Sequence, residues 1–456
     1  MKSRQKFMFF FNGYKLVIHF IVFSLLLIFT GKAFFSTSEL FLLYLYGATV
    51  IFVILATFFV TFIKYIDPYE IALEKEERMG RMKNLSVSCM VAVKDEEDMI
   101  EKCVLSLTNQ THKIKEIIFV NDASTDGTAQ ILNKYERKGE IKVIHLRYNI
   151  GKKKALGKAM AVAKGEIFAF SDSDSVWAPD ALGKIIKIFN ACPSVGAVSG
   201  HVRALNSSKN LLTRIQDSWY EGQFAIRKAF ESIFGAVTCV SGPLAAYRKD
   251  AIFNCIPAWE YDTFLNREFK FATDRTLTGF VLGSKSIGEK FKKKYKNSPF
   301  VKSIDYPVRD WKTVYCKAAK AWTNVPDTPK RLLKQQIRWK KSFLRSIFFT
   351  GAFYWKKPLL PALFYYLHIV FVLAGPFIAF RHLVYLPLRG DIISIFLYLS
   401  GILFIGFMFG LAYKFENRES HIWVYRPLMS LISTLILSWL IFYSAATVNK
   451  NTWSRK

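Results

Sequence analysis

The sequence predicts an α/β domain with a parallel sheet, placed between apolar segments that lie near both ends of the chain. In the polar middle, short apolar runs alternate with helical patterns, which is typical of strands joined by crossover helices. Toward both ends, apolar runs recur whose length approaches the ~20 residues needed to span a bilayer. The 52% hydrophobic content excludes a disordered polycation, although the net charge is +29.

The expected elements of the polar middle follow one another closely. Strands are predicted at 85–93, 114–120, 141–146 and 167–170, and helices at 99–107, at 129–138 and from Lys152 onward. In a sheet of this kind, ligands bind at the carboxyl ends of the strands. The polar clusters that follow these strands are therefore the first candidates for ligand-binding and catalytic residues.

Five apolar segments predict a membrane protein: 15–30, 40–63, 359–380, 392–413 and 428–448. The first is marginal because it contains His19, and a signal peptide is the alternative. Basic residues on both sides of the N-terminal pair place its ends in the cytoplasm. Three C-terminal spans would leave the chain end outside, yet its lysines and arginine favour the inside. One of these segments is then re-entrant or interfacial, or a crossing is missed.

The charge and the cysteines limit the partners and the compartment. Residues 281–350 carry 18 Lys and Arg against 4 Asp and Glu, a pattern typical of a face beside anionic lipid. We expect no nucleic-acid partner, because the run lies in a membrane-flanked chain without a recognised nucleic-acid module. Six scattered cysteines without a CxxC pair argue against a zinc ribbon or a secreted disulfide scaffold.

Four polar groups follow the four strands. Asp172 and Asp174 form a D-x-D turn, which suits a hard divalent cation or is only a turn. Asp122 can accept hydrogen bonds from a base or ribose, or form an Asx turn. Lys152 follows Gly151 at a helix start, where a phosphate is favoured, or simply begins an exposed basic helix. Together with the acidic group at 95–97, they should converge on a nucleotide-diphosphate site with a bridging metal.

These motifs resemble a known family. V-N-D-A-S-T-D-G-T at 120–128, N-I-G-K-K-K-A at 149–155 and S-D-S-D at 171–174 are similar to the family-2 glycosyltransferases. Downstream, V-S-G-P-L-A-A-Y-R at 240–248, T-D-R-T-L-T at 273–278 and K-Q-Q-I-R-W-K-K-S-F at 334–343 resemble processive members, bacterial hyaluronan synthases above all and also chitin-oligosaccharide synthases. The resemblance covers roughly 85–345, and its Q-x-x-R-W element is specific to processive membrane polysaccharide synthases.

The resemblance implies a role for each motif residue. Asp274 would be the catalytic base, or alternatively an ion-pair partner of Arg275, and Asp174 would hold Mg²⁺ or Mn²⁺. The donor would be bound by Glu96, Asp122, Lys152, Asp172, Gln335 and Arg338. The acceptor would be bound by Ser241, Gly242, Pro243 and Trp339. Two alternatives stay open: the Ser-Gly-Pro segment is a simple turn, and the Q-x-x-R-W helix is only a membrane-surface anchor.

The implied organisation is an α/β GT-A (Rossmann-like) cytosolic domain inserted between N- and C-terminal transmembrane helices, with amphipathic interfacial helices. The expected parts are a transmembrane hairpin at 1–66, the GT-A domain at 83–328, the interfacial Q-x-x-R-W helix at 329–350, transmembrane segments at 357–449 and a cytosolic tail at 450–456. The expected location is the cell membrane, with several spans and a cytoplasmic catalytic domain.

The implied function is inverting, processive polymerisation of UDP-sugars, with membrane lipids and the growing polysaccharide as partners. Hyaluronan synthesis from UDP-GlcNAc and UDP-GlcA is the leading expectation. The alternatives are a chitin-oligosaccharide or other single-sugar synthase, a polyprenyl-phosphate glycosyltransferase, and a non-catalytic membrane sugar-nucleotide sensor. The chain departs from the family pattern at several places: Asp95, the pair Ala272-Thr273, a basic insert at 284–310 and Ser454 in the C-terminal W-S-R.

Overall fold

The computed structural model describes residues 41–80 and 83–450. The chain divides into two units, of which the first ends at Ala56 and the second begins at Thr57. Helix α2 (Phe41–Lys64) runs from one into the other, and the description below concerns the second unit. The apolar run at 15–30 and the W-S-R motif at 453–455 lie outside the described residues.

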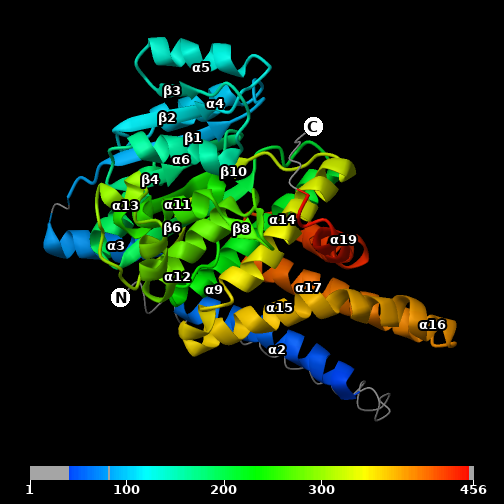
Figure 1. Cartoon of the computed structure of the whole chain (residues 1–456). Helices are drawn as coiled ribbons and strands as arrows, with labels where there is room; N and C mark the ends of the chain where they lie inside the picture. Colours follow the sequence, from blue (N-terminus) through cyan, green and yellow to red (C-terminus); the bar gives the residue numbers. More distant parts are fainter. Residues whose placement is uncertain (1–40, 81–82, 451–456) are drawn as a thin grey trace. The chain divides into compact units, whose positions relative to one another are not determined.

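A mixed eight-stranded sheet forms the centre of the second unit, in the order β3-β2-β1-β4-β7-β6-β10-β5 (Figure 1). Its strands are β1 (Val87–Val93), β2 (Glu116–Asn121), β3 (Lys142–His145), β4 (Ile167–Phe170), β5 (Ser175–Trp177), β6 (Val195–Ala204), β7 (Ala245–Arg248) and β10 (Lys312–Thr323). The four predicted strands are confirmed as β1 to β4, and they pair in parallel. A separate small ladder joins β8 (Thr263–Phe264) to β9 (Arg267–Glu268).

The prediction of a parallel sheet holds for β1 to β4 and for the pair β6–β10, but it is wrong for β5 and β7. Strand β7 runs antiparallel to both neighbours, β4 and β6, and β5 runs antiparallel to β10. No crossover is made between β6 and β7, because the intervening helices return the chain to the edge of the sheet where β6 ends. This reversal brings the start of β7 to the carboxyl end of β4, since Phe170 pairs with Ala245.

Helices cover both faces of the sheet, because the side chains of each strand alternate between two apolar clusters. In β1, Val91 joins a cluster with α3 (Pro68–Met79), α4 (Ile100–Thr108), α5 (Thr128–Arg137) and α7 (Ala181–Ala191). The neighbouring Met90 joins the opposite cluster, with α6 (Lys152–Val162), α11 (Ile256–Glu260) and α12 (Thr273–Lys294). The predicted helices at 99–107 and 129–138 and from Lys152 are confirmed as α4, α5 and α6.

The remaining elements connect this core to the apolar helices. They are α8 (Leu211–Gly222), η2 (Gln223–Lys228), α9 (Ala229–Ile233), η3 (Gly242–Leu244), α10 (Lys249–Ile252), η4 (Phe253–Cys255), α13 (Pro299–Lys302), α14 (Pro329–Phe349) and η5 (Tyr354–Lys356). Helix α14 contains the Q-x-x-R-W motif, and its bounds agree to within one residue with the helix expected at 329–350.

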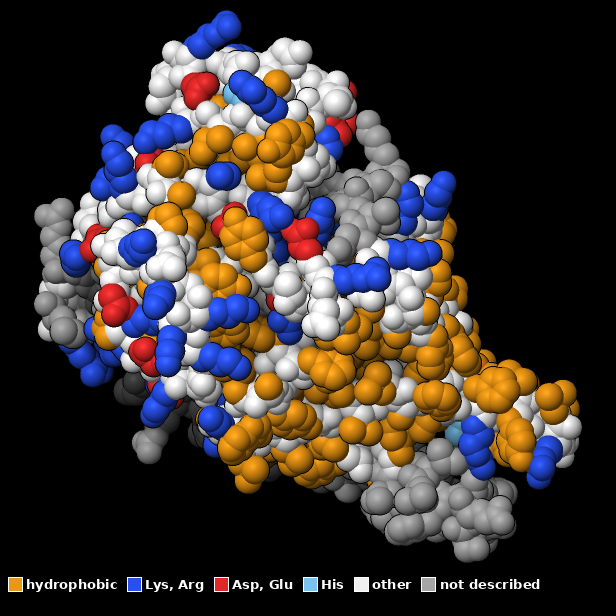
Figure 2. All heavy atoms as spheres, viewed as in Figure 1, with side chains coloured by type: hydrophobic (Ala, Val, Ile, Leu, Met, Phe, Trp, Pro, Cys, Tyr) orange, Lys and Arg blue, Asp and Glu red, His pale blue; other side chains and the backbone are white. Residues whose placement is uncertain are grey.

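Three helical stretches among the described residues are long and apolar enough to cross a membrane: Tyr46–Arg78, Leu359–Leu388 and Ile393–Phe415. The second comprises α15 (Leu359–Phe380), η6 (Arg381–Tyr385) and α16 (Leu386–Leu388), and the third coincides with most of α17 (Ile393–Glu416). Figure 2 shows hydrophobic side chains gathered over α15 and α17.

The last apolar segment, predicted at 428–448, is a bent pair rather than a straight helix. Ile422–Leu437 and Leu440–Ala446 meet at 45°. It is built from η7 (Ile422–Tyr425), α18 (Arg426–Ile432), η8 (Ser433–Leu437) and α19 (Leu440–Ala446). Such a bend is compatible with a broken span or with the re-entrant segment considered above.

Candidate active site

A pocket lies where the carboxyl end of β4 meets the start of β7. Lys152, Asp172, Gly242 and Asp274 line it together, although they come from four separate sequence motifs. Gly242 lies so close to the D-x-D turn that a Cβ atom added to it would be 3.0 Å from Asp172 Oδ1. A side chain at this position would displace the carboxylate, which explains the need for glycine.

The ammonium of Lys152 forms an ion pair with Asp172 inside this pocket. Lys152 begins α6, and the preceding Gly151 has a φ of +87°, which a residue with a Cβ atom rarely adopts. Asp122 holds this turn, because its carboxylate accepts hydrogen bonds from the backbone N–H groups of Ile150 at 2.7 Å and Gly151 at 3.0 Å. The strand-end clusters thus support one another, as the convergence argument predicts.

Asp174 is a buried carboxylate beside a second one. Its Oδ1 accepts a hydrogen bond from Thr323 at 3.2 Å. Burial and the neighbouring Asp172 carboxylate together raise the pKa of Asp174 to about 6, although Lys152 opposes both. A buried carboxylate whose pKa is raised by a neighbouring carboxylate favours a cation beside it.

A divalent cation therefore fits the D-x-D turn. The described residues contain no cluster of three or more His, Cys, Asp or Glu side chains placed to hold a metal. The protein would accordingly supply one or two ligands, and diphosphate oxygens and water would complete the shell, as is usual for Mg²⁺.

Asp274 lies in the first turn of α12. Its Oδ2 accepts a hydrogen bond from the backbone N–H of Gly242 at 3.1 Å. Ala272, which caps the helix, has a left-handed backbone with φ 61°, a conformation that costs a non-glycine residue about 1–2 kcal/mol. The strained cap and the Gly242 contact fix the direction in which the Asp274 carboxylate faces the pocket.

Helix α14 carries Arg338, which interacts with the same carboxylates, and Trp339, which packs against α8. Burial lowers the pKa of Arg338, while Asp172 and Asp174 oppose this, so the guanidinium lies within electrostatic reach of the D-x-D turn. The indole of Trp339 stacks on Trp219 of α8, with ring centroids 5.6 Å apart and an interplanar angle of 28°.

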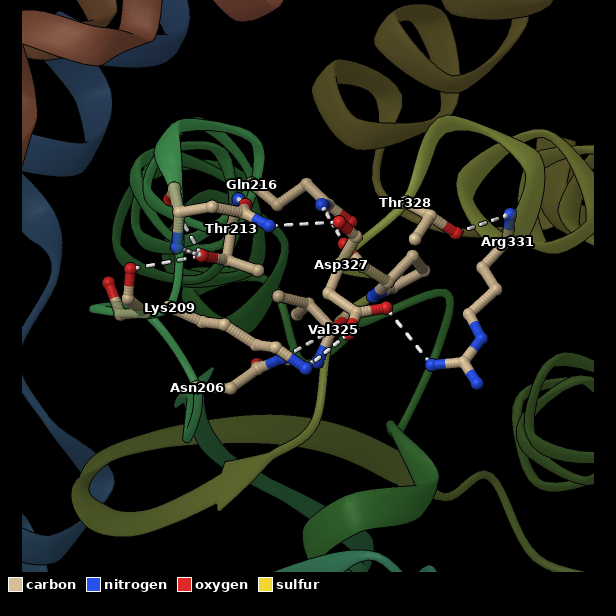
Figure 3. Close-up of polar contacts among 11 residues, drawn as sticks. Asn206, Lys209, Thr213, Gln216, Val325, Asp327, Thr328 and Arg331 are labelled. Carbon is tan, nitrogen blue, oxygen red and sulfur yellow. Dashed lines mark hydrogen bonds and ion pairs between the residues drawn. The ribbon is translucent and has the colours of Figure 1, made fainter.

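A polar clamp fixes the start of α14 to the loop before α8 (Figure 3). Asn206 exchanges two hydrogen bonds with the backbone of Val325, at 2.8 and 2.9 Å. Figure 3 shows Asp327 between Lys209 and Arg331, with ion-pair distances of 2.5 and 3.0 Å. Trp219 on α8 and Trp339 on α14 both follow this clamp in the sequence. The clamp therefore positions the surface that these two stacked rings form.

The other predicted residues are not among those that line the pocket. Ser241 Oγ is 2.5 Å from the ammonium of Lys228, and the carbonyl of Pro243 accepts a hydrogen bond from Trp177 at 2.6 Å. The half-buried Glu96 follows β1, and its N–H donates to Thr128. Gln335 is half-buried on α14. The roles assigned to these residues stay predictions.

Lys228 is a site residue that sequence reasoning missed. Its ammonium contacts Ser199 at 2.9 Å as well as Ser241 and lies over the ring of Phe224. Burial lowers the pKa of Lys228 to about 8. No motif surrounds it in the sequence, and only its position at the end of a π-helical turn brings it behind the Ser-Gly-Pro segment.

Comparison with known proteins identifies the domain. The family model described as glycosyl transferase family 2 matches residues 88–253. A hyaluronan synthase from Streptococcus pyogenes is 28% identical over 369 residues, which cover 79% of this chain and 80% of the relative. Hyaluronan synthase 2 from Xenopus laevis is 26% identical over 423 residues, covering 81% of this chain and 69% of the relative.

A solved structure shares the fold. The mannosyltransferase PcManGT from Pyrobaculum calidifontis, in complex with GDP-Man and Mn²⁺, superposes with a TM-score of 0.50 at 18% sequence identity, covering 88% of this chain and 99% of that one. At this identity the likeness concerns the fold alone. It confirms the GT-A, Rossmann-like expectation for the α/β domain.

Proposed function

Since the chain is a family-2 glycosyltransferase similar to hyaluronan synthases over most of its length, we propose that it polymerises UDP-GlcNAc and UDP-GlcA into hyaluronan and secretes the polymer. One observation carries this proposal: Lys152, Asp172, Gly242 and Asp274 line a single pocket. The Q-x-x-R-W helix lies within electrostatic reach of that pocket through Arg338.

The donor would bind at the carboxyl ends of β1, β2 and β4. Asp122 and Glu96 would contact uracil and ribose, while Lys152 and Arg338 would pair with the diphosphate and Gln335 would assist them. Lys152 already forms an ion pair with Asp172, so donor binding has to share or replace that contact. Asp174 would hold Mg²⁺ or Mn²⁺ with the help of Asp172. The cation, when bound, would neutralise charge developing on the departing UDP.

Asp274 would act as the general base. Its carboxylate would take the proton from the acceptor hydroxyl as that oxygen attacks the anomeric carbon, for which it must lie about 2.6–3.2 Å from the hydroxyl. The N–H of Gly242 bonds one carboxylate oxygen, leaving the other for the acceptor. Attack from the face opposite the diphosphate inverts the anomeric configuration.

The acceptor sugar would rest on the Ser241-Gly242-Pro243 turn and on Trp339. Pyranose rings present an apolar C–H face that matches an aromatic plane. Trp339 is held flat by its stacking on Trp219, so its ring is ordered before the acceptor binds. An ordered acceptor surface suits a processive enzyme, because the chain end must be repositioned after each transfer.

We place the protein in the cell membrane, with several spans, a cytoplasmic catalytic domain and lipids as partners. The apolar stretches Leu359–Leu388 and Ile393–Phe415 support this, as does the bent pair that follows them. The growing polysaccharide would leave through these helices. A cytoplasmic active site is required because nucleotide sugars are made in the cytosol.

The test is product analysis with defined donors. The purified full chain is given UDP-GlcNAc, UDP-GlcA or both with Mg²⁺ or Mn²⁺, and the product is digested with linkage-specific hydrolases. We expect long polymer only with both donors. Polymer from UDP-GlcNAc alone would identify a chitin-type synthase, an organic-soluble product would identify a polyprenyl-phosphate enzyme, and no turnover of any donor would indicate a sensor.

A further inference from the structure

The basic segment 284–310 has no part in the proposed reaction. It comprises the C-terminal half of α12 and the short α13, and it carries eight Lys and Arg against three Asp and Glu. In Figure 2, basic side chains gather over the region where Figure 1 labels α12 and α13. The question is what such a dense positive surface contacts.

The segment is anchored rather than loose. Asn254 donates to the carbonyls of Phe300 at 2.8 Å and Ile304 at 2.7 Å, and it accepts from the N–H of Tyr306 at 2.8 Å. Phe291 packs edge-on against Phe280 with ring centroids 5.1 Å apart. The lysines are therefore presented from a fixed scaffold.

All three acidic residues of the segment already have partners. Glu289 and Asp305 pair with Lys292 at 3.6 and 2.5 Å, and Asp310 pairs with Lys357 at 2.9 Å. Six lysines are left exposed, and within the described part of the chain none of them has a carboxylate partner. These six, called the lysine face below, are Lys285, Lys290, Lys293, Lys294, Lys296 and Lys302.

The segment packs at the point where the apolar helix α15 begins. Ile287 of α12 lies against a cluster that contains Phe353 and Ala362, the latter from the first turn of α15. The ion pair of Asp310 with Lys357 crosses the same junction. The junction is itself apolar on its surface, because Trp355 is 62% and Leu359 84% exposed.

We propose that the lysine face binds the headgroups of anionic phospholipids in the leaflet that α15 enters. Lysines without a carboxylate partner, on a segment that packs against the start of α15 and its exposed tryptophan and leucine, match the boundary between anionic headgroups and acyl chains. The inference rests on the membrane position given under the proposed function. It adds a lipid-binding surface that the polymerisation chemistry does not require.

The experiment compares the full-length protein with a triple variant, Lys293→Gln, Lys294→Gln and Lys296→Gln. Both are reconstituted in nanodiscs of equimolar phosphatidylglycerol and phosphatidylcholine and transferred to neutral detergent, and the retained lipids are quantified by mass spectrometry. Each lysine near an anionic membrane surface strengthens binding to anionic lipid by roughly fivefold. The triple variant should therefore lower the retained ratio of phosphatidylglycerol to phosphatidylcholine by about tenfold or more.

The matched control replaces three other exposed lysines by glutamine, Lys102, Lys113 and Lys115. They lie in and after α4, at the end of the domain away from α12 (Figure 1). This control should retain the wild-type lipid ratio. The proposal is overturned if the lipid ratio is unchanged in the lysine-face variant, or if it falls equally in the control. It is also overturned if the lysine-face variant loses affinity for the anionic polymer but still retains phosphatidylglycerol.

Polymer synthesis in phosphatidylcholine alone is measured on the same preparations. The lysine-face variant should match the wild type there, because no lysine of the face lies in the active-site pocket. A lost lipid preference with normal synthesis supports the lipid site. Inactive wild type with an intact lipid preference would instead count against the proposed function alone.

Discussion

Asp262 holds two cations from different helices in a buried site. Its carboxylate pairs with Lys153 Nζ at 3.0 Å and with Arg345 Nη2 at 2.7 Å. Lys153 and Asp262 are each 4% exposed, and burial lowers the pKa of Lys153. Because Lys153 belongs to α6 and Arg345 to α14, this one carboxylate joins the helix that Lys152 begins to the Q-x-x-R-W helix.

Replacing Asp262 by Asn should destabilise the protein strongly. Two cations would be left in a site closed to water, and breaking a buried ion pair by removing one partner costs about 3–5 kcal/mol. The adjacent pair Lys154–Glu268 provides a control of similar chemistry, at 2.7 Å but with side chains 30% and 41% exposed. Glu268→Gln should cost only about 0.2–1 kcal/mol, the usual range for exposed pairs.

Both variants are assayed by thermal unfolding in the same detergent, together with UDP affinity below the melting range. Asp262→Asn should melt well below the wild type and Glu268→Gln close to it. The double variant Asp262→Asn, Lys153→Met should recover part of the loss, because one stranded charge is removed. Equal melting shifts for the two single variants would refute the argument that burial gives Asp262 its large contribution.

Four further outcomes are expected. Asp274→Asn should abolish sugar transfer while UDP-sugar affinity stays near wild type in an equilibrium binding assay; near-normal synthesis would remove its assignment as the base. Trp339→Ala should reduce polymer synthesis and acceptor use by about tenfold or more while UDP affinity changes little, as loss of one aromatic contact of 1–3 kcal/mol predicts; equal losses would contradict this division of roles. Chelation of divalent metal should stop transfer, and Mn²⁺ or Mg²⁺ should restore it in the wild type but not in Asp174→Ala. Finally, burial of the Lys228 ammonium destabilises the folded protein below the folded-state pKa of about 8. As the pH rises from 8 toward 10, the folded chain loses this proton while the unfolded chain keeps it, so the destabilisation decreases. The melting temperature of wild type relative to Lys228→Met should therefore rise between pH 8 and 10, and a constant difference would contradict the burial.

The first half of the domain could be predicted from the sequence because its signals are local. Strands β1 to β4 are short apolar runs followed by polar turns, and parallel pairing brings their ends together without further information. Lys152 and Asp172 are 20 residues apart, yet both follow from this rule, and they form an ion pair. Helix α15 was predicted with the bounds that the structure shows, because an apolar run of that length is typical of a membrane-spanning helix.

The direction of β7 and several contacts around the candidate site depend on residues that are far apart in the sequence and leave no local pattern. Nothing around Asp262 indicates that it will meet Arg345, 83 positions later. The direction of β7 is set by how α8 and α9 return the chain, and composition does not encode that path. Since β7 determines where Gly242 lies, the contact between Gly242 and Asp274 became visible only with the fold. The motifs therefore predicted which residues to consider, while the antiparallel direction of β7 explains why Gly242 and Asp274 meet.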